Sequence, residues 1–521
     1  MIYILISLLA IVAVFANNTE MTDTHIIPKW ICTLGIVAVA GVVYGILIPY
    51  IKQYKFRLKP PIVMVALICF CQALYAIIQA LKIGLSEFEH QATGSFDNPA
   101  GLVACICTGI PCCIYLIRTS ECNIIRTLVK VIIVVIETAL ILSESRTGIL
   151  AGIFPITLWL LSTIKKRWVK ILLLAGIILL LPVMYFMKKD SADGRLLMFR
   201  CGWDMIKDRP IFGHGINGVQ ANYMDYQARW FSEHPESHFT MLADNVKSVF
   251  NEYLTIWICF GSVGLIVLVT FVCFILHCYR KKHSEEGLCS LMSLGTIGIL
   301  GCFSYPFSYP FTWIVFVLNT LILICKAYPI NFSKCKRVRY MIATTLFLSS
   351  SFLLYHVIKR YYAEVEWGGI SHMALKGEGE EVFPRYKALM PVLGNEPYFL
   401  YNFAAELYME RHYETALVIA ERCQSFWADY DLELLLGELY YKQNKYDEAE
   451  RYFNHAHNMC PVRFLPLYRL FQMYKKIGDK DKARQMGLRI LNKPIKVKSE
   501  TIDNIIESVK QDYFSQNQMY K

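Results

Sequence analysis

Long apolar runs constrain this chain more than any other feature of its sequence. A helix needs roughly 17 to 25 residues to cross about 30 Å of hydrocarbon, so we predict an all-α, polytopic membrane helical bundle of about eleven spans. The first run lacks the basic leader of a signal peptide, and we expect it to stay as a span. The predicted spans are Ile2 to Phe15, Pro28 to Tyr50, Pro61 to Leu81, Pro99 to Ile117, Leu128 to Leu142, Thr147 to Ile164, Val169 to Met187, Val249 to Cys278, Leu288 to Phe303, Pro310 to Cys325 and Tyr340 to Ile358.

The charges give the orientation of these spans. The 521 residues are 55% hydrophobic and 18% charged, with a net charge of +11, which is too apolar for an ordinary soluble protein. The basic residues cluster in short loops between apolar runs, so we expect the lipid bilayer and no nucleic acid as their partner. The clusters are Lys52, Lys55, Arg57 and Lys59; Arg118 and Arg126; Lys165, Lys166 and Arg167; Arg280, Lys281 and Lys282; and Lys334, Lys336, Arg337 and Arg339. With about eleven spans they all face one side, predicted to be the cytoplasm.

Two segments are polar enough to leave the membrane. The long loop 188–247 carries charges of both signs, and loops of such length are more often functional than accidental. The tail 359–521 contains small and aromatic residues that recur with the period of about 34 residues typical of a tetratricopeptide repeat. These residues are Leu436, Gly437, Tyr440, Ala449, Phe453, Ala456 and Pro461, with Tyr474 and Ala483 one period later and Ala416 in a looser copy upstream.

Three domains follow from these boundaries. We predict a transmembrane domain over 1–358, a loop at 188–247 within it, and a repeat domain over 359–521. Repeats of this kind stack into an α-solenoid with a concave binding surface, so the tail is expected to bind a protein partner or to serve as a spacer. The orientation puts both the loop and the tail on the side opposite the cytoplasm.

Cysteine gives no sign of a metal or a disulfide framework. Most of the 18 cysteines lie inside or beside apolar runs, where they act as small hydrophobic residues. No cluster of Cys and His has the spacing of a zinc site. We expect neither a metal nor another cofactor.

Charged motifs at the predicted membrane boundary are the candidates for chemistry. The stretch "LSESRTGILAG" places Glu144 and Arg146 between two apolar runs, where charge is costly unless it serves a polar site or a solvated turn. The long loop contains "GRLLMFRCGWDMIKDRPIFGHG", with Arg195, Arg200 and His214, and the chain returns to the membrane through "NEYLTIWICFGSVGL".

Together with "GSFDNPAGL" before an earlier span, these motifs resemble the O-antigen ligase and polymerase family over roughly residues 94–265. The resemblance implies a donor glycan linked to undecaprenyl diphosphate, an acceptor hydroxyl on a glycolipid, a glycan or a protein, and no metal or nucleotide sugar. It also implies a bacterial inner membrane, with the loop and the tail in the periplasm.

The resemblance and the chemistry of phosphate select the same residue type. Without a metal, a departing diphosphate needs fixed cations, and guanidinium groups bind phosphate oxygens in pairs without losing their charge. Arg146 and Arg195 match the arginine positions of the family and are the predicted catalytic cations. Arg200, Arg229 and Asn251 are the predicted substrate-binding residues.

The chain departs from the family at one position. Many members carry a histidine immediately before the asparagine of the return motif, as a general base on the acceptor, whereas this chain has Phe250. Another group must then accept the proton. The candidates are His214, His234, His238 and Glu252.

Several functions compete on these residues. The leading one is transfer of lipid-linked glycan to an acceptor, as in an O-antigen ligase, and a polymerase would break the same diphosphate bond. A non-catalytic scaffold acting through the repeats is a second class, favoured by Phe250. A transporter is a third, because Glu137 lies in the middle of a predicted span.

Overall fold

The computed structural model describes residues 2–50, 59–81, 92–187, 189–329, 336–374, 376 and 379–518. These residues form helices, turns and loops without a β-strand, so the all-α prediction is confirmed for them. Four predicted basic positions (Lys52, Lys55, Arg57 and Lys334) and the first residue of the predicted loop, Lys188, lie outside the described ranges.

Two compact units make up the chain, and each is described by itself. The membrane unit comprises Met1–Met184, Phe250–Tyr253 and Ile266–Gly369. The loop–tail unit comprises Tyr185–Val249, Leu254–Leu265 and Ile370–Lys521. The predicted loop and the predicted tail thus cluster into one unit, a grouping that sequence order does not suggest.

Eight helical segments are long and apolar enough to cross a membrane among the residues described. They are α2 with η1 (Ile26–Leu47 and Ile48–Tyr50), α3 (Lys59–Ala80), α4 with α5 (Pro99–Ile106 and Gly109–Thr119), α7 (Arg146–Thr163), α11 (Glu252–Lys281), α12 (Glu285–Phe303), α13 (Pro310–Ala327) and α14 (Lys336–Ala374). Each overlaps a predicted span. The total of about eleven stays a prediction.

The other three predicted spans are also helices. The first is the short apolar α1 (Ile2–Phe15), and the others are α6 (Asn123–Leu142) and α8 (Arg167–Met187). Helix α6 contains Arg126, Lys130 and Glu137, more charge than an ordinary span carries. Glu137 Oε1 is buried without a hydrogen-bond partner among the described residues, and it lies close to Gly152 of α7.

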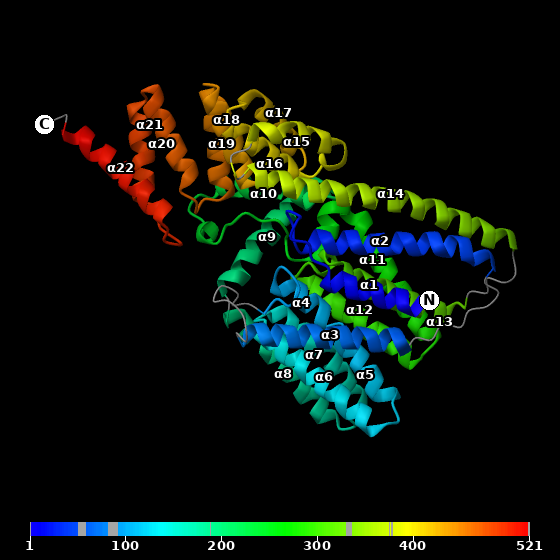
Figure 1. Cartoon of the computed structure of the whole chain (residues 1–521). Coiled ribbons are helices and arrows are strands. Elements are labelled where there is room, and N and C mark those ends of the chain that lie inside the picture. Colours follow the sequence, from blue (N-terminus) through cyan, green and yellow to red (C-terminus); the bar gives the residue numbers. More distant parts are fainter. Residues whose placement is uncertain are drawn as a thin grey trace. The chain divides into compact units, whose positions relative to one another are not determined.

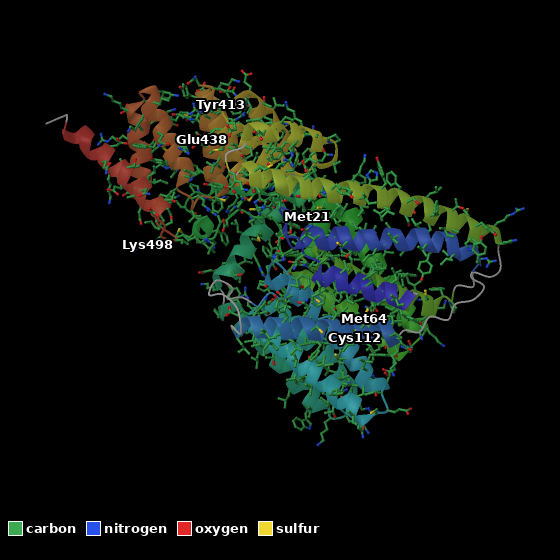
Figure 2. All side chains as sticks on the ribbon, viewed as in Figure 1. Met21, Met64, Cys112, Tyr413, Glu438 and Lys498 are labelled. Carbon is green, nitrogen blue, oxygen red and sulfur yellow. The ribbon has the colours of Figure 1, made fainter. Side chains whose placement is uncertain are left out.

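Helices α4 and α5 form the centre of the membrane unit and are buried over nearly their whole length. Small side chains permit this. A Cβ on Gly109 would lie 2.5 Å from Cβ of Cys69 on α3, and Cys105 and Cys107 are almost fully buried. Cysteine therefore acts here as a small packing residue, as expected. Figure 2 labels Cys112 within this group of helices.

Helix α2 packs closely on the membrane part of α14 (Figure 1). Gly41 and Gly45 of α2 form a GxxxG pair, the spacing that lets two membrane helices approach. A Cβ on Gly41 would overlap Ser350, and one on Gly45 would lie 2.9 Å from the backbone of Phe347. The close contact explains why glycine occupies both positions.

The loop–tail unit begins with two helices of the loop, α9 (Lys189–Asp208) and α10 (Gly218–Glu233), and the short η2 (His238–Met241). The tail adds consecutive helices, labelled in Figure 1: α15 (Gly379–Leu393), α16 (Pro397–Met409), α17 (Tyr413–Gln424), α18 (Tyr430–Lys442), α19 (Tyr446–Met459), α20 (Leu465–Ile477), α21 (Lys480–Leu491) and α22 (Glu500–Gln518).

Neighbouring tail helices pack through the residues that the repeat pattern singled out. A Cβ on Gly437 of α18 would lie 2.6 Å from the ring of Phe453 on α19, and Ala449 and Ala456 are fully buried. Tyr440 stacks on Tyr452 at a centroid distance of 5.2 Å. The assignment of these helices to the tetratricopeptide family stays a prediction.

Helix α11 is broken at Gly261, which has φ 61° and ψ −154°, and residues 210–215 of the loop fill the break. The freed carbonyl oxygens of Ile258 and Cys259 accept hydrogen bonds from the N–H groups of His214 and Gly215, at 2.8 and 2.9 Å. In the other direction, the N–H of Ser262 donates to the carbonyl of Pro210 at 2.8 Å. These hydrogen bonds with the loop pair backbone N–H and C=O groups of α11 that the break leaves without partners inside the helix.

Replacing Gly261 by alanine should destabilise the protein. The backbone at this position suits glycine alone, and an added Cβ would overlap the carbonyl of Ile211. We expect a loss of at least about 1–3 kcal/mol, read as a lower melting temperature of the purified full chain. Gly194→Ala in α9 is the matched control, because its Cβ would meet no described atom within 4 Å. Equal melting temperatures for Gly261→Ala and wild type would contradict the role given to the break.

Candidate functional site

Arg146 is the first residue of α7, and the turn before it is tightly built. Glu144 has φ 51°, unusual for a residue other than glycine, and the Ser145 side chain caps α7 by accepting a hydrogen bond from the N–H of Gly148 at 3.3 Å. A helix start carries partial positive charge and favours anions. The half-buried guanidinium of Arg146 adds a full positive charge at the same place.

The return motif begins with the same backbone feature. Phe250 has φ 51°, and its ring makes an edge contact with Tyr305 at 5.3 Å. The side-chain amide of Asn251 donates to the carbonyl of Cys302 at 2.9 Å. Glu252, the first residue of α11, accepts a hydrogen bond from the N–H of Phe307 at 3.3 Å. Asn251 and Glu252 therefore hold the connection between α12 and α13, which contains η3 (Pro306–Ser308).

This connection meets the start of α4 in a group that we call the α4–η3 cluster: Asp97, Asn98, Tyr305 and Tyr309. The Tyr309 hydroxyl donates to Oδ1 of Asp97 at 3.1 Å and to Oδ1 of Asn98 at 3.2 Å. The Asn98 amide donates to the other Asp97 oxygen at 2.7 Å and to the Tyr305 hydroxyl at 3.2 Å. Asp97 is thus oriented through both of its oxygens.

Buried polar side chains fix the segment before α4. The ammonium group of Lys29, fully buried in α2, donates to the carbonyl of Ser95 at 2.9 Å. Gln79 accepts the N–H of Gly94 at 2.7 Å, and Gln72 accepts the N–H of Ser95 at 3.2 Å. This much buried polarity is costly unless every group is paired, so the segment is held in one conformation.

The α4–η3 cluster combines the exposed carboxylate of Asp97 with the buried phenol of Tyr309 and the partly buried phenol of Tyr305. Burial, together with the charge of Asp97, raises the pKa of Tyr305 and of Tyr309, so both hydroxyls keep their protons. Asp97 is exposed and lies directly before α4, where a substrate can reach it. It can therefore receive a proton from a hydroxyl group of a substrate.

Asp97 and Arg146 lie at the same end of the membrane unit. Helix α6 packs antiparallel between α5 and α7, so α4 with α5 and α7 run in the same direction. Gly148 of α7 faces Val103 of α4, with a built Cβ 2.8 Å from that side chain. This end of the membrane unit thus carries a carboxylate, two phenols and an arginine, of which the sequence singled out the arginine alone.

The sequence alone does not single out Asp97, Tyr305 and Tyr309 as candidate functional residues. The motif "GSFDNPAGL" resembles the family through its glycine and asparagine, and the resemblance gives its aspartate no role. An aspartate directly before the cap of a span was the available signal. The two tyrosines gave none, because their partners lie more than 200 positions away in the chain.

The predicted arginines of the loop all lie in the loop–tail unit. Arg195 is partly exposed in α9. Arg200 lies over the ring of Trp230 at 5.1 Å. Arg229 pairs with Asp208 at 3.4 Å and also lies over the ring of Tyr226. Two of the three loop arginines thus have aromatic partners inside the loop.

The three loop histidines have different surroundings. Nε2 of His214 is 2.9 Å from the carbonyl oxygen of Met205. His234 stacks on the ring of Trp230 at 3.9 Å. His238 begins η2 and contacts the ring of Phe239. Because the backbone of His214 also fills the break in α11, a change at this residue would disturb structure as well as any chemistry.

The loop is anchored on the tail. The fully buried side chain of Gln227 in α10 donates to the carbonyls of Asp244 at 3.0 Å and of Met459 at 2.7 Å. Asn245 donates to Asp429 at 2.8 Å, and Arg463 pairs with Asp244 at 2.9 Å. These contacts make the tail a support for the loop.

A pH-dependent contact belongs to this anchorage. His455 of α19 is 3.0 Å from Asp225 of α10, and although burial opposes its charge, the hydrogen bond to Asp225 raises the pKa of His455 above 6.5. The contact therefore stabilises the docked loop fully below about pH 6.5. This stabilisation is lost as the pH rises through the raised pKa of His455. We expect hydrogen-exchange protection of α10 amides to fall as the pH rises above about 6.5.

His455→Gln is the matched variant, and it should remove most of this pH dependence. Protection that changes equally with pH in both proteins would show that another group is responsible.

The described residues define a multi-pass membrane protein built from helices. Residues 131–269 match the family model described as O-antigen ligase, and this range contains Arg146, the loop and the return motif. The chain therefore carries the domain of the O-antigen ligase family, whose members are glycosyltransferase-like enzymes of ligase or polymerase type. No curated protein matches the chain.

Proposed function

We propose that this protein transfers a glycan from undecaprenyl diphosphate to an acceptor at the periplasmic face of the inner membrane, without a metal. The match of residues 131–269 to the O-antigen ligase family carries the proposal, because it includes the arginine that begins α7. The proposed acceptor is a glycolipid such as lipid A core, a glycan or a protein, as for a ligase. A growing glycan chain, as for a polymerase, is the alternative.

Arg146 is proposed to stabilise the diphosphate as it leaves. Its guanidinium and the positive end of the α7 dipole provide the positive charge that a departing diphosphate requires. Arg195 is the second cation proposed to stabilise the leaving diphosphate. Arg200, Arg229 and Asn251 are kept as proposed substrate ligands, although Asn251 and Arg229 also hold neighbouring groups within their own units.

Asp97 is proposed to take the role of the absent histidine. It accepts the proton of the acceptor hydroxyl as that oxygen attacks the anomeric carbon of the donor glycan and the bond to the diphosphate breaks. Tyr309 and Asn98 orient the carboxylate, and Phe250 contacts Tyr305 in the same cluster. His214, His234, His238 and Glu252 remain alternative bases.

Glycan transfer by variants tests both assignments. We expect Arg146→Ala to lower transfer about 10²–10³-fold and Arg146→Lys to recover part of the loss, because lysine supplies charge without the paired donors. Asp97→Asn should lower transfer about 10²–10⁴-fold. The assay is surface glycan profiling of a deletion strain complemented with each variant, with expression of each protein verified.

Arg167→Ala is the matched control, since Arg167 begins α8 as Arg146 begins α7 and is exposed. Lipid-linked polymer that accumulates without attachment would indicate a ligase, and single unextended units would indicate a polymerase. Activity retained by Asp97→Asn but lost in Glu252→Gln or a histidine variant would move the base to that residue.

A non-catalytic scaffold is the second candidate, because Phe250 stands where the family has a histidine. It predicts that Arg146→Ala and Asp97→Asn both restore the surface glycan in full. Point variants are preferable to deletion of the tail, because deletion would uncover the buried face of α10 and damage the loop.

A further inference from the structure

A polar cavity of about 510 Å³ lies in the tail, within the range of about 300–1,000 Å³ common for ligand sites. Amide side chains form much of its lining, from Gln424 of α17 and from Asn454 and Asn458 of α19. Charged residues complete it, with Glu433 from the start of α18 and Arg451 and His455 from α19. The cavity lies outside the segment that matches the O-antigen ligase family.

Glu433 is the buried group of this cavity. Its side chain is 2% exposed, and one carboxylate oxygen, Oε1, accepts a hydrogen bond from Gln424 at 2.6 Å. No described residue donates a hydrogen bond to the other oxygen. This oxygen is free to accept a hydrogen bond from a hydroxyl group of a ligand in the cavity.

The charges around the cavity are balanced. Arg451 and His455 face Glu433, and His455 is also held by Asp225 from α10 of the loop. Two acidic and two basic groups leave no strong field of one sign to select a charged ligand. A neutral ligand with many hydrogen-bonding groups fits this arrangement better than an anion or a cation.

One wall of the cavity is aromatic. Tyr452 lines it, with Arg451 lying over the ring at 5.0 Å and Tyr440 stacked on Tyr452. The stack holds Tyr452 in place. The ring of Tyr452 adds apolar surface to the wall, while the amides offer both donors and acceptors to the hydroxyl groups of a sugar.

We propose that this cavity binds a neutral, hydroxyl-rich segment of glycan and thereby recruits the acceptor. The proposal rests on the proposed glycan transfer and adds a carbohydrate subsite outside the family domain. Each hydroxyl of a sugar both donates and accepts, which matches three amides and a carboxylate with a free oxygen. Asp225 of the loop borders the same site through His455, so bound glycan would lie beside α10.

A peptide is the less fitting occupant. The lining provides no apolar pocket for a side chain, and its two basic residues, Arg451 and His455, face Glu433. A neighbouring cavity of about 420 Å³ does contain basic residues, Arg489 and Lys493, and would suit anions. The difference between the two cavities gives the experiment an internal comparison.

The test is direct binding to the purified full chain in detergent, by saturation-transfer NMR and calorimetry. The probes are three soluble sets: neutral tetrasaccharides, uronic-acid or phosphorylated tetrasaccharides, and acidic and neutral octapeptides. We expect saturable binding of at least one neutral tetrasaccharide. The isosteric variant Glu433→Gln and the double variant Arg451→Ala with Asn458→Ala should each weaken it at least about tenfold.

Two controls locate the binding. Glu448→Gln changes an exposed acid on α19 outside the cavity, and Arg489→Gln changes the neighbouring basic cavity. Both should bind the neutral probe as the wild type does. Circular dichroism and the melting temperature separate loss of binding from loss of folding, and Glu433→Gln keeps the shape of the side chain if the double variant unfolds.

Every other result overturns the proposal. Binding of charged sugars alone, of peptides alone, or of none of the probes would exclude a neutral glycan site, as would equal binding by wild type and Glu433→Gln. The outcome is independent of catalysis, because Arg146→Ala should bind the neutral probe normally. Normal binding by a wild-type protein that transfers no glycan would refute the proposed function and leave this site intact.

Discussion

Apolar surroundings leave a broken helix no solvent to satisfy its backbone, and this constraint governs how the loop is held. The gap at Gly261 in α11 is closed by backbone groups from residues 210–215, so hydrogen bonds that a regular helix makes within itself join two segments instead. Gly213 approaches the backbone of Cys259 so closely that a Cβ would lie 2.5 Å from it. The position of α9 and α10 within their unit follows from this junction.

In the membrane unit, polar side chains rather than backbone groups hold distant segments together. Lys29, Gln72 and Gln79 fix the segment that ends at Asp97, and Asn98 both caps α4 and orients the carboxylate beside it. A cluster assembled from two distant segments is thereby rigid before any substrate arrives. Such preorganisation is the main way in which a protein without covalent chemistry of its own accelerates group transfer.

Local patterns in the sequence predicted most of the helices. They did not predict the contacts between segments that are distant in the chain. Apolar periodicity located the helices from Ile2 to Ile358, because the length of a span depends on nearby residues alone. The same reasoning placed the boundary residue Arg146 at a helix start. It could not bring Tyr305 and Tyr309 to Asp97, nor α10 to α19, since tertiary contacts between such separated positions leave no local periodicity.

The anchorage of α10 also sets an order of events during synthesis. Gln227 and its acceptor Met459 are separated by 232 positions, so the loop is made long before the helix that covers it. Until then the side chains of Tyr223, Met224 and Phe231 lack the partners that bury them. The loop must therefore wait for the end of the chain, or be shielded by a chaperone, before it reaches its final structure.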